Sequence, residues 1–120
     1  MAKTIMIAAN DPNLIYLLQR YAEESGFGTV KTGWNEDALS LAQNTKPAVI
    51  ILEIELPGTK GWEILRWLKA EPTTHNIPVV VYSWLDEEAC SQVEGVSGYL
   101  QRSVLYDDFL AALKQAGVQY

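Results

Sequence analysis

Short apolar runs alternate with amphipathic stretches along the whole chain. The runs predict strands at residues 5–9, 29–32, 48–52, 77–82 and 99–100. The clearest of them, residues 48–52, is apolar at consecutive positions, which is typical of a strand buried on both faces. This run breaks off at Glu53.

Apolar residues at helical spacing predict a helix after each of these strands. The first two predicted helices begin at Asp11-Pro12 and at Asn35. The third surrounds Trp62 to Leu68, and the last two cover residues 86–93 and 105–116. We expect Asp11 to cap the first helix, with Pro12 at its first position and Gly26 at its end.

This alternation predicts an α/β fold with a parallel sheet covered on both faces. Right-handed crossovers favour a flavodoxin-like, doubly wound three-layer sandwich, with five strands in the order 2-1-3-4-5 and five helices. We expect residues 1–120 to form a single domain, because this length is enough for one hydrophobic core and too short for two. In such folds the functional crevice lies outside the carboxyl ends of the strands.

Composition excludes some classes of partner. The formal net charge of -6 argues against nucleic acid, because phosphate contacts need a basic face. No apolar stretch approaches the roughly 20 residues that a membrane-spanning helix needs. Cys90 is the single cysteine and has no internal disulfide partner, which is typical of a reducing compartment. We therefore expect a cytoplasmic protein that binds neither nucleic acid nor membrane.

Four segments together resemble the receiver domain of bacterial response regulators (CheY-like). Residues 5–12 resemble its first strand and acidic turn, and residues 50–61 the segment that holds the phosphoacceptor. Residues 77–83 resemble its fourth strand, which makes Ser83 the switch hydroxyl. Residues 98–103 resemble its fifth strand, which makes Tyr99 the switch aromatic. The resemblance covers nearly the whole chain and implies signalling in a two-component or phosphorelay system.

The residues that such a family uses for phosphoryl transfer are replaced. Ala9 and Asn10 stand in place of the acidic pair, Glu53 in place of the phosphoacceptor aspartate, and Arg102 in place of the lysine. Trp84 follows the switch hydroxyl, where the family usually has a small residue. Its indole is expected either to cover the mouth of the pocket or to lie flat on the fourth helix as surface packing.

These replacements predict that the chain is not an enzyme and has no catalytic residues. Aspartyl phosphorylation needs a short carboxylate nucleophile and a Mg²⁺ ion. Ala9 offers no ligand and Asn10 a neutral one, while the extra methylene of Glu53 moves its oxygens by about 1.5 Å. A misplacement of about 1 Å can cost on the order of 10²-fold in rate. We expect no cofactor and no bound Mg²⁺. The alternative is a metal site built from Asp11, Glu53 and Glu55.

Glu53 and Arg102 indicate what replaces the phosphoryl switch. We predict a charge-assisted pair between them across the third and fifth strands. The pair would imitate an acyl phosphate with a charge of about -1 instead of about -1.5 to -2. Ser83 and Tyr99 would then stay in the active-like arrangement. The alternative is ordinary polar packing with no switching.

The favoured hypothesis is a pseudo-receiver that acts through protein–protein interaction, as a monomer or weak homodimer. The resemblance places its partner surface on the fourth helix, fifth strand and fifth helix, with Tyr99 and Tyr106. The alternative is an atypical receiver that a histidine kinase still phosphorylates. A flavodoxin-like cofactor binder would need a glycine- or hydroxyl-rich loop after the first strand, and residues 9–12 offer none.

Overall fold

Five parallel strands form one sheet in the order β2-β1-β3-β4-β5. The structure, a computed structural model, describes residues 3–32, 37–54, 60–83, 95–101 and 105–118. The strands are β1 (Thr4–Ala8), β2 (Gly28–Thr32), β3 (Val49–Glu53), β4 (Val79–Ser83) and β5 (Gly98–Gln101). Their order and parallel pairing confirm the predicted doubly wound fold.

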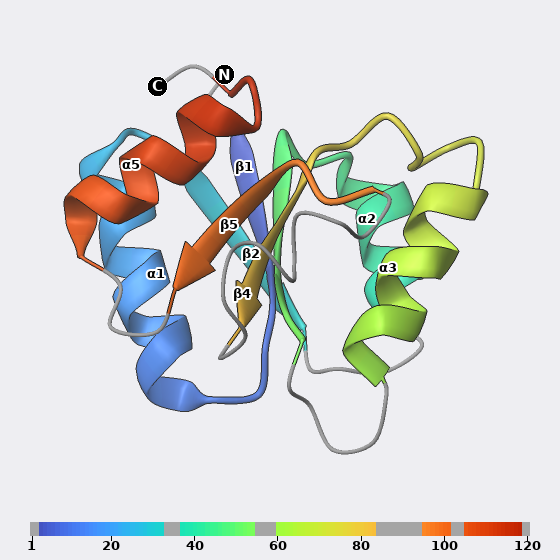
Figure 1. The fold of residues 1–120 in the computed structure, drawn as a ribbon, viewed down its shortest axis with the longest axis horizontal. Helices are drawn as coiled ribbons and strands as arrows, with labels where there is room; N and C mark the ends of the chain where they lie inside the picture. Colours follow the sequence, from blue (N-terminus) through green and yellow to red (C-terminus); the bar gives the residue numbers. More distant parts are fainter. Residues whose placement is uncertain (1–2, 33–36, 55–59, 84–94, 102–104, 119–120) are drawn as a thin grey trace.

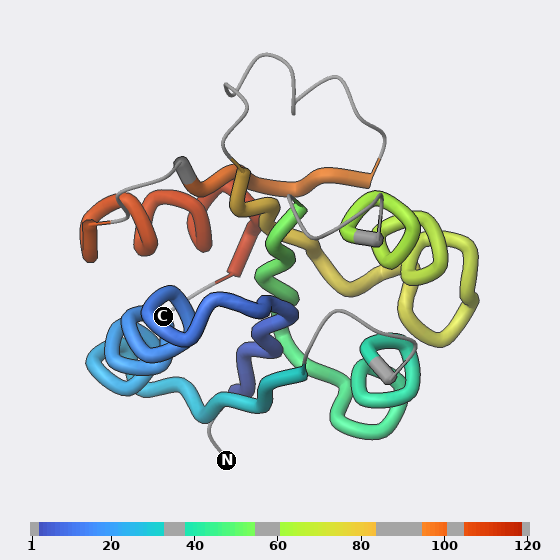
Figure 2. Tube along the Cα trace, turned by 90° about the horizontal axis from the view of Figure 1, so that it is seen from below, coloured from blue at the N-terminus to red at the C-terminus, as the bar shows by residue number. Residues whose placement is uncertain are grey.

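Helices cover both faces of the sheet and make three layers (Figure 1). They are α1 (Pro12–Glu24), α2 (Asp37–Thr45), α3 (Lys60–Ala70) and α5 (Tyr106–Gln115). Helices α1 and α5 lie on one face, and α2 and α3 lie on the other (Figure 2). The helix predicted at residues 86–93 lies outside the described residues. Within the described ranges, no helix is both long and apolar enough to cross a membrane.

The side chains of the strands alternate between two cores, because successive residues of a strand point to opposite faces. Ile5, Ile7 and Ala9 belong to the core under α1 and α5. Met6 and Ala8 belong to the core under α2 and α3. Every residue of β3 and β4 is buried, and the unbroken apolar run at residues 48–52 predicted this for β3.

The start of α1 is fixed close to the end of β1. Asp11 is the N-cap, and its side chain accepts a hydrogen bond from the Asn13 N–H at 3.0 Å. Pro12 is the first helical residue, and Gly26 follows the helix with a φ of 83°. The predicted cap and stop are therefore confirmed.

Two strands continue one residue beyond the apolar runs that predicted them. Glu53 pairs with Tyr82, and Ser83 pairs with Gln101, so both polar residues are inside the sheet. The backbone ladder decides this, because its hydrogen bonds do not depend on the polarity of the side chains. The same ladder brings both polar side chains to the carboxyl edge of the sheet.

Candidate functional site

The carboxyl ends of neighbouring strands bring the predicted site residues to one edge of the sheet. Strand β1 lies beside β3, with Ala8 opposite Leu52, and β3 lies beside β4, with Glu53 opposite Tyr82. Because all three strands run in the same direction, the residues after β1 and at the ends of β3 and β4 are neighbours.

The Glu53 side chain is buried at this edge, with 9% of its surface exposed. Its Oε1 accepts a hydrogen bond from the backbone N–H of Asn10 at 3.0 Å. A buried carboxylate is costly unless such donors solvate it. The bond joins the end of β3 to the turn after β1, residues that are 43 positions apart in the chain. The turn therefore holds the carboxylate in place.

The two positions of the expected acidic pair contribute no carboxylate. Ala9 is 3% exposed, its side chain packs in the core under α1 and α5, and its N–H donates to the Thr32 carbonyl at 3.2 Å. The Asn10 residue is exposed, and only its backbone N–H is bonded to Glu53. Next in the chain, Asp11 is engaged in capping α1.

Among the described residues, this edge supplies few of the roughly six oxygen ligands that a Mg²⁺ ion takes in near-octahedral geometry. A buried methyl group stands at residue 9, and Glu53 already accepts an N–H. Within the ranges described, no three His, Cys, Asp or Glu side chains come together as metal ligands. Glu55 lies outside those ranges, so the alternative site with Asp11, Glu53 and Glu55 stays a prediction.

Gly61 lets the start of α3 lie directly against the end of β3. A Cβ at this position would lie 2.6 Å from Ile54 Cα and 2.9 Å from the Glu53 carbonyl oxygen. No side chain fits there without moving the backbone that carries Glu53. The sequence placed Gly61 within the segment that resembles the phosphoacceptor region, but this contact has no signal in the local sequence.

Ser83 and Tyr99 hold different places in the sheet. Ser83 is fully buried at the end of β4. Tyr99 of β5 is paired with Val81 of β4. It is partly buried and packs against the core under α2 and α3. Trp84 and Arg102 lie outside the described residues. The cover over the pocket and the Glu53–Arg102 pair therefore stay predictions.

Tyr106 and Tyr99 pack against different cores of the sheet. The Tyr106 hydroxyl is 2.9 Å from Ser25 Oγ, and its ring lies 5.3 Å from the Tyr21 ring and 6.4 Å from the Phe109 ring, centroid to centroid. These contacts direct Tyr106 toward α1, on the face of the sheet opposite to the core that Tyr99 joins. The sequence predicts that residue 106 lies in a helix, but it does not indicate that the side chain packs toward α1.

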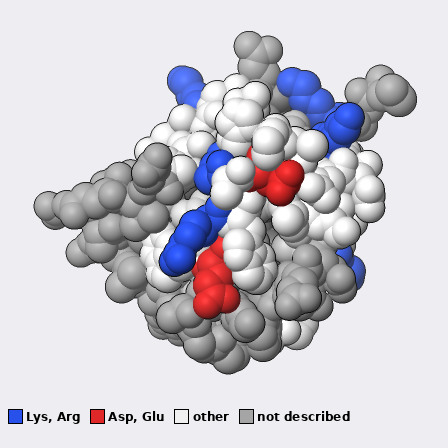
Figure 3. All heavy atoms as spheres, turned by 90° about the vertical axis from the view of Figure 1, so that its right-hand side faces the viewer, with Lys and Arg blue, Asp and Glu red and all other residues white. Residues whose placement is uncertain are grey.

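The surface over α2 and α3 carries mixed charge. In Figure 3, lysine and arginine atoms are separated by acidic and uncharged atoms and do not form a continuous patch over the described part of this face. Of the described charged residues on α3 and the segment after it, Arg66 and Lys69 are basic and Glu63 and Glu71 are acidic. This face therefore lacks the basic stripe typical of nucleic-acid binding in the residues seen.

Comparison with known proteins agrees with this architecture. Residues 5–114 match the response regulator receiver domain family. The chain is 30% identical over 118 residues to the polar-differentiation response regulator DivK of Brucella anthropi, with 95% of each chain covered. The fold matches the chemotaxis response regulator CheY4 of Vibrio cholerae, with a TM-score of 0.86, 15% identity, and 97% and 99% of the two chains covered.

A second solved structure contains a magnesium ion. It is the receiver domain of a sensor histidine kinase from Pseudomonas aeruginosa, with a magnesium ion coordinated in its active-site cleft. The TM-score is 0.83 at 16% identity, and 98% of this chain and 99% of that chain are covered. At this identity the likeness concerns the fold.

Proposed function

The chain belongs to the response regulator receiver family, and from that premise we propose that it is a signalling domain that acts without being phosphorylated. In this proposal it is a pseudo-receiver of a two-component or phosphorelay system. It binds a protein partner and catalyses no phosphoryl transfer.

The bond between the Asn10 N–H and Glu53 Oε1 is the observation that carries this proposal. A nucleophilic carboxylate must present a free oxygen in line with the phosphodonor. Here the carboxylate is longer than aspartate, and one of its oxygens is held by the turn after β1. The buried Ala9 methyl group replaces an oxygen ligand nearby. Both features disfavour an acyl phosphate on residue 53.

The same bond supports the hypothesis that Glu53 substitutes for a phosphorylated aspartate. Its carboxylate places a fixed negative charge beyond the end of β3, and a backbone N–H already recognises that charge. A pair with Arg102 would complete the imitation. In this hypothesis Ser83 and Tyr99 stay in one arrangement, and partner binding does not depend on a kinase.

The proposed partner is a protein that docks on the surface formed by β5 and the segments beside it. Tyr99 is the residue of β5 on which this assignment rests, whereas Tyr106 packs toward α1. The net charge of -6 supports a protein partner over nucleic acid. We place the protein in the cytoplasm, as a monomer or weak homodimer that needs no cofactor.

Incubation with acetyl phosphate and Mg²⁺, followed by intact-mass measurement, tests the proposal. The expected result is no adduct of about 80 Da, the mass of one phosphoryl group. The receiver domain of the Pseudomonas kinase, treated in parallel, shows that the reagent is active. A stoichiometric phosphoryl adduct on the wild-type chain would overturn the proposal.

A phosphorylated atypical receiver is the second candidate, and the retained framework around residue 53 favours it. Gly61 still allows α3 to lie against β3, and Ser83 is still buried at the end of β4. In this hypothesis an adduct forms, and Glu53→Gln locates it. Loss of the adduct in this variant assigns the phosphate to Glu53, whereas its persistence assigns it to a neighbouring residue.

A further inference from the structure

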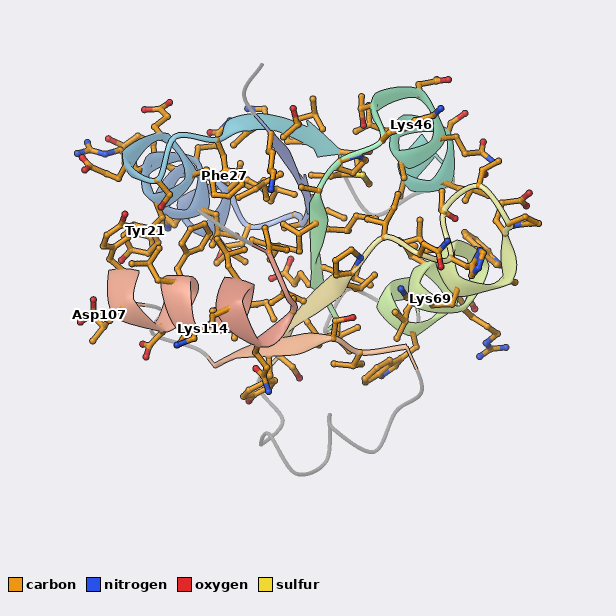
Figure 4. The ribbon with its side chains drawn as sticks, turned by 90° about the horizontal axis from the view of Figure 1, so that it is seen from above. Tyr21, Phe27, Lys46, Lys69, Asp107 and Lys114 are labelled. Atoms are coloured by element: carbon orange, nitrogen blue, oxygen red, sulfur yellow. The ribbon has the colours of Figure 1, made fainter. Side chains whose placement is uncertain are left out.

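Lys69 joins α3 to the segment that leads into β4. Its Nζ donates hydrogen bonds to the carbonyl oxygens of His75 at 3.1 Å and Ile77 at 2.6 Å. The residue is half-buried in the last turn of α3. Figure 4 labels it on the opposite side of the sheet from Lys114 of α5. One side chain thus holds the approach to β4.

The stem of Lys69 also supports the approach to β5. Gly95 lies against it, since a Cβ on Gly95 would be 2.8 Å from Lys69 Cγ, 3.5 Å from Cδ and 3.6 Å from Cε. The φ of Gly95 is +94°, which favours glycine independently. Two residues later the Ser97 N–H donates to the Val79 carbonyl at 2.8 Å and begins the β4–β5 pairing. We call these contacts of Lys69 with residues 75, 77 and 95 the Lys69 latch.

A neutral amine can donate both hydrogen bonds of the Lys69 latch, as an ammonium can. A neutral –NH₂ group has two N–H donors, one for each carbonyl, and keeps a lone pair. Burial lowers the pKa of the Lys69 ammonium below the ordinary lysine value. The one imidazole nearby, that of His75, has Nδ1 3.0 Å from the Pro72 carbonyl oxygen. Lys69 is therefore an amine whose reactive form keeps its contacts.

We propose that Lys69 is a site of acylation by small acyl phosphates or acyl thioesters, and that its acylation opens the Lys69 latch. In the reaction with acetyl phosphate, Nζ attacks the acetyl carbonyl carbon and an amide bond forms. The bond from that carbon to the phosphate oxygen breaks, and inorganic phosphate leaves with the proton that the amine loses. The product has one N–H donor for two carbonyls.

The turn between α3 and β4 has an independent support, so acylation acts locally. Thr74 is 1% exposed, and its Oγ1 donates to the Leu68 carbonyl at 2.6 Å. This bond keeps the turn attached to α3 when Lys69 releases it. The approaches to β4 and β5 then loosen without loss of the fold. The expected consequence is a change at the β5 surface that depends on modification.

Peptide mapping after limited incubation with acetyl phosphate tests the modification. Lys114 on α5 and Lys46 after α2 are exposed lysines in the same sample (Figure 4). We expect several-fold more acetyl on Lys69 than on Lys114, as an addition of about 42 Da that is distinct from a phosphoryl group. An unmodified Lys69 beside acetylated Lys114 and Lys46 would overturn the proposal. Because the adducts differ in mass, this outcome is independent of the proposed function.

Hydrogen exchange at the Ser97 amide tests the structural consequence. Loss of one hydrogen bond is expected to speed its exchange about fivefold in the acetylated protein. Lys69→Gln, which has a neutral amide in place of the amine, should show a similar increase. Lys69→Arg keeps several N–H donors and cannot be acylated, so its exchange should stay close to wild type. Equal exchange in the acetylated and unmodified proteins would show that Lys69 is not a latch.

Discussion

The two ends of the sheet use opposite charges to hold the backbone. At the carboxyl end, the Glu53 carboxylate accepts the Asn10 N–H. At the amino end, the Lys69 amine donates to two carbonyls that precede β4. Strand ends leave main-chain groups without a ladder partner, and each charged side chain satisfies groups of the complementary kind.

The two ends also differ in what the family would place there. The carboxyl end is the region where the family resemblance expects phosphoryl chemistry, and there the acidic pair is replaced while Gly61 and Ser83 are kept. The amino end carries no expected chemistry, yet it holds the amine with the perturbed pKa. In this chain, the end of the sheet at which a residue lies does not by itself indicate whether the residue stabilises the fold or is chemically reactive.

Gly61→Ala gives the largest expected loss of stability, because its Cβ would collide with the backbone at the end of β3. We expect a decrease of about 3 kcal/mol in the free energy of unfolding, measured by urea titration. Gly26→Ala is the matched control. Gly26 has a φ of +83° with nothing within 4 Å, so only the conformational cost of about 1 kcal/mol applies. Equal losses in the two variants would show that the approach of α3 to β3 is not tight.

Thr74→Val tests whether the amino end has its own support. The substitution keeps the shape but removes the donor to the Leu68 carbonyl, which should cost about 2 kcal/mol in urea unfolding. At the exposed neighbouring position, Thr73→Val removes only the surface hydrogen bond from Gln43 and should cost less than about 0.5 kcal/mol. If both changes have the same small effect, the turn does not depend on Thr74.

Lys46→Gly should stabilise the protein. Lys46 follows α2 with a φ of 45°, a left-handed conformation that costs a side-chain-bearing residue about 1 kcal/mol. Glycine avoids this cost, although it gains freedom in the unfolded chain, so we expect a gain of up to about 1 kcal/mol. The thermal unfolding midpoint measures it. Lys46→Ala, which retains the strain, is the control, and a larger gain with alanine would contradict this account.

Lys69 should give the smallest effect, visible as a dependence on pH. Its pKa is lower in the folded chain than the ordinary value of 10.5, so the unfolded chain binds more protons between the two values. The free energy of unfolding therefore rises with pH between the folded and the unfolded pKa of Lys69. Above the unfolded pKa, Lys69 causes no further rise. Compared with Lys69→Met, the wild type should gain stability as the pH approaches 10.5. A relative loss over that range would reverse the assigned sign.

The sequence predicted the framework well because its signals are local. Consecutive apolar residues marked β3, and Asp11-Pro12 marked the start of α1. The strand order followed from the alternation and from the resemblance. The apolar run and the Asp-Pro pair each act within a few residues of the chain. Hydrophobic periodicity and capping chemistry are therefore sufficient to predict these elements.

The contacts of the site were less predictable because they cross the fold. The donor to Glu53 is a backbone N–H, which any non-proline residue at position 10 would supply. The identity of the side chain at this position therefore does not predict the hydrogen bond. The α5 helix places the Tyr106 hydroxyl beside Ser25, which is 81 positions earlier in the chain, and no local pattern indicates this contact. The latch at Lys69 depends on Gly95, which is distant in sequence. Such contacts require the tertiary arrangement.

The central claim is that the carboxyl edge no longer accepts a phosphoryl group. Its most direct test is the phosphoryl stoichiometry, by intact mass, of the wild type and the Ala9→Asp, Asn10→Asp, Glu53→Asp, Arg102→Lys variant in the same reaction with acetyl phosphate and Mg²⁺. The account predicts no phosphoryl adduct on the wild type and an adduct on the variant, which regains the acidic pair, the short nucleophile and the lysine. An adduct on the wild type that matches the variant would contradict the account.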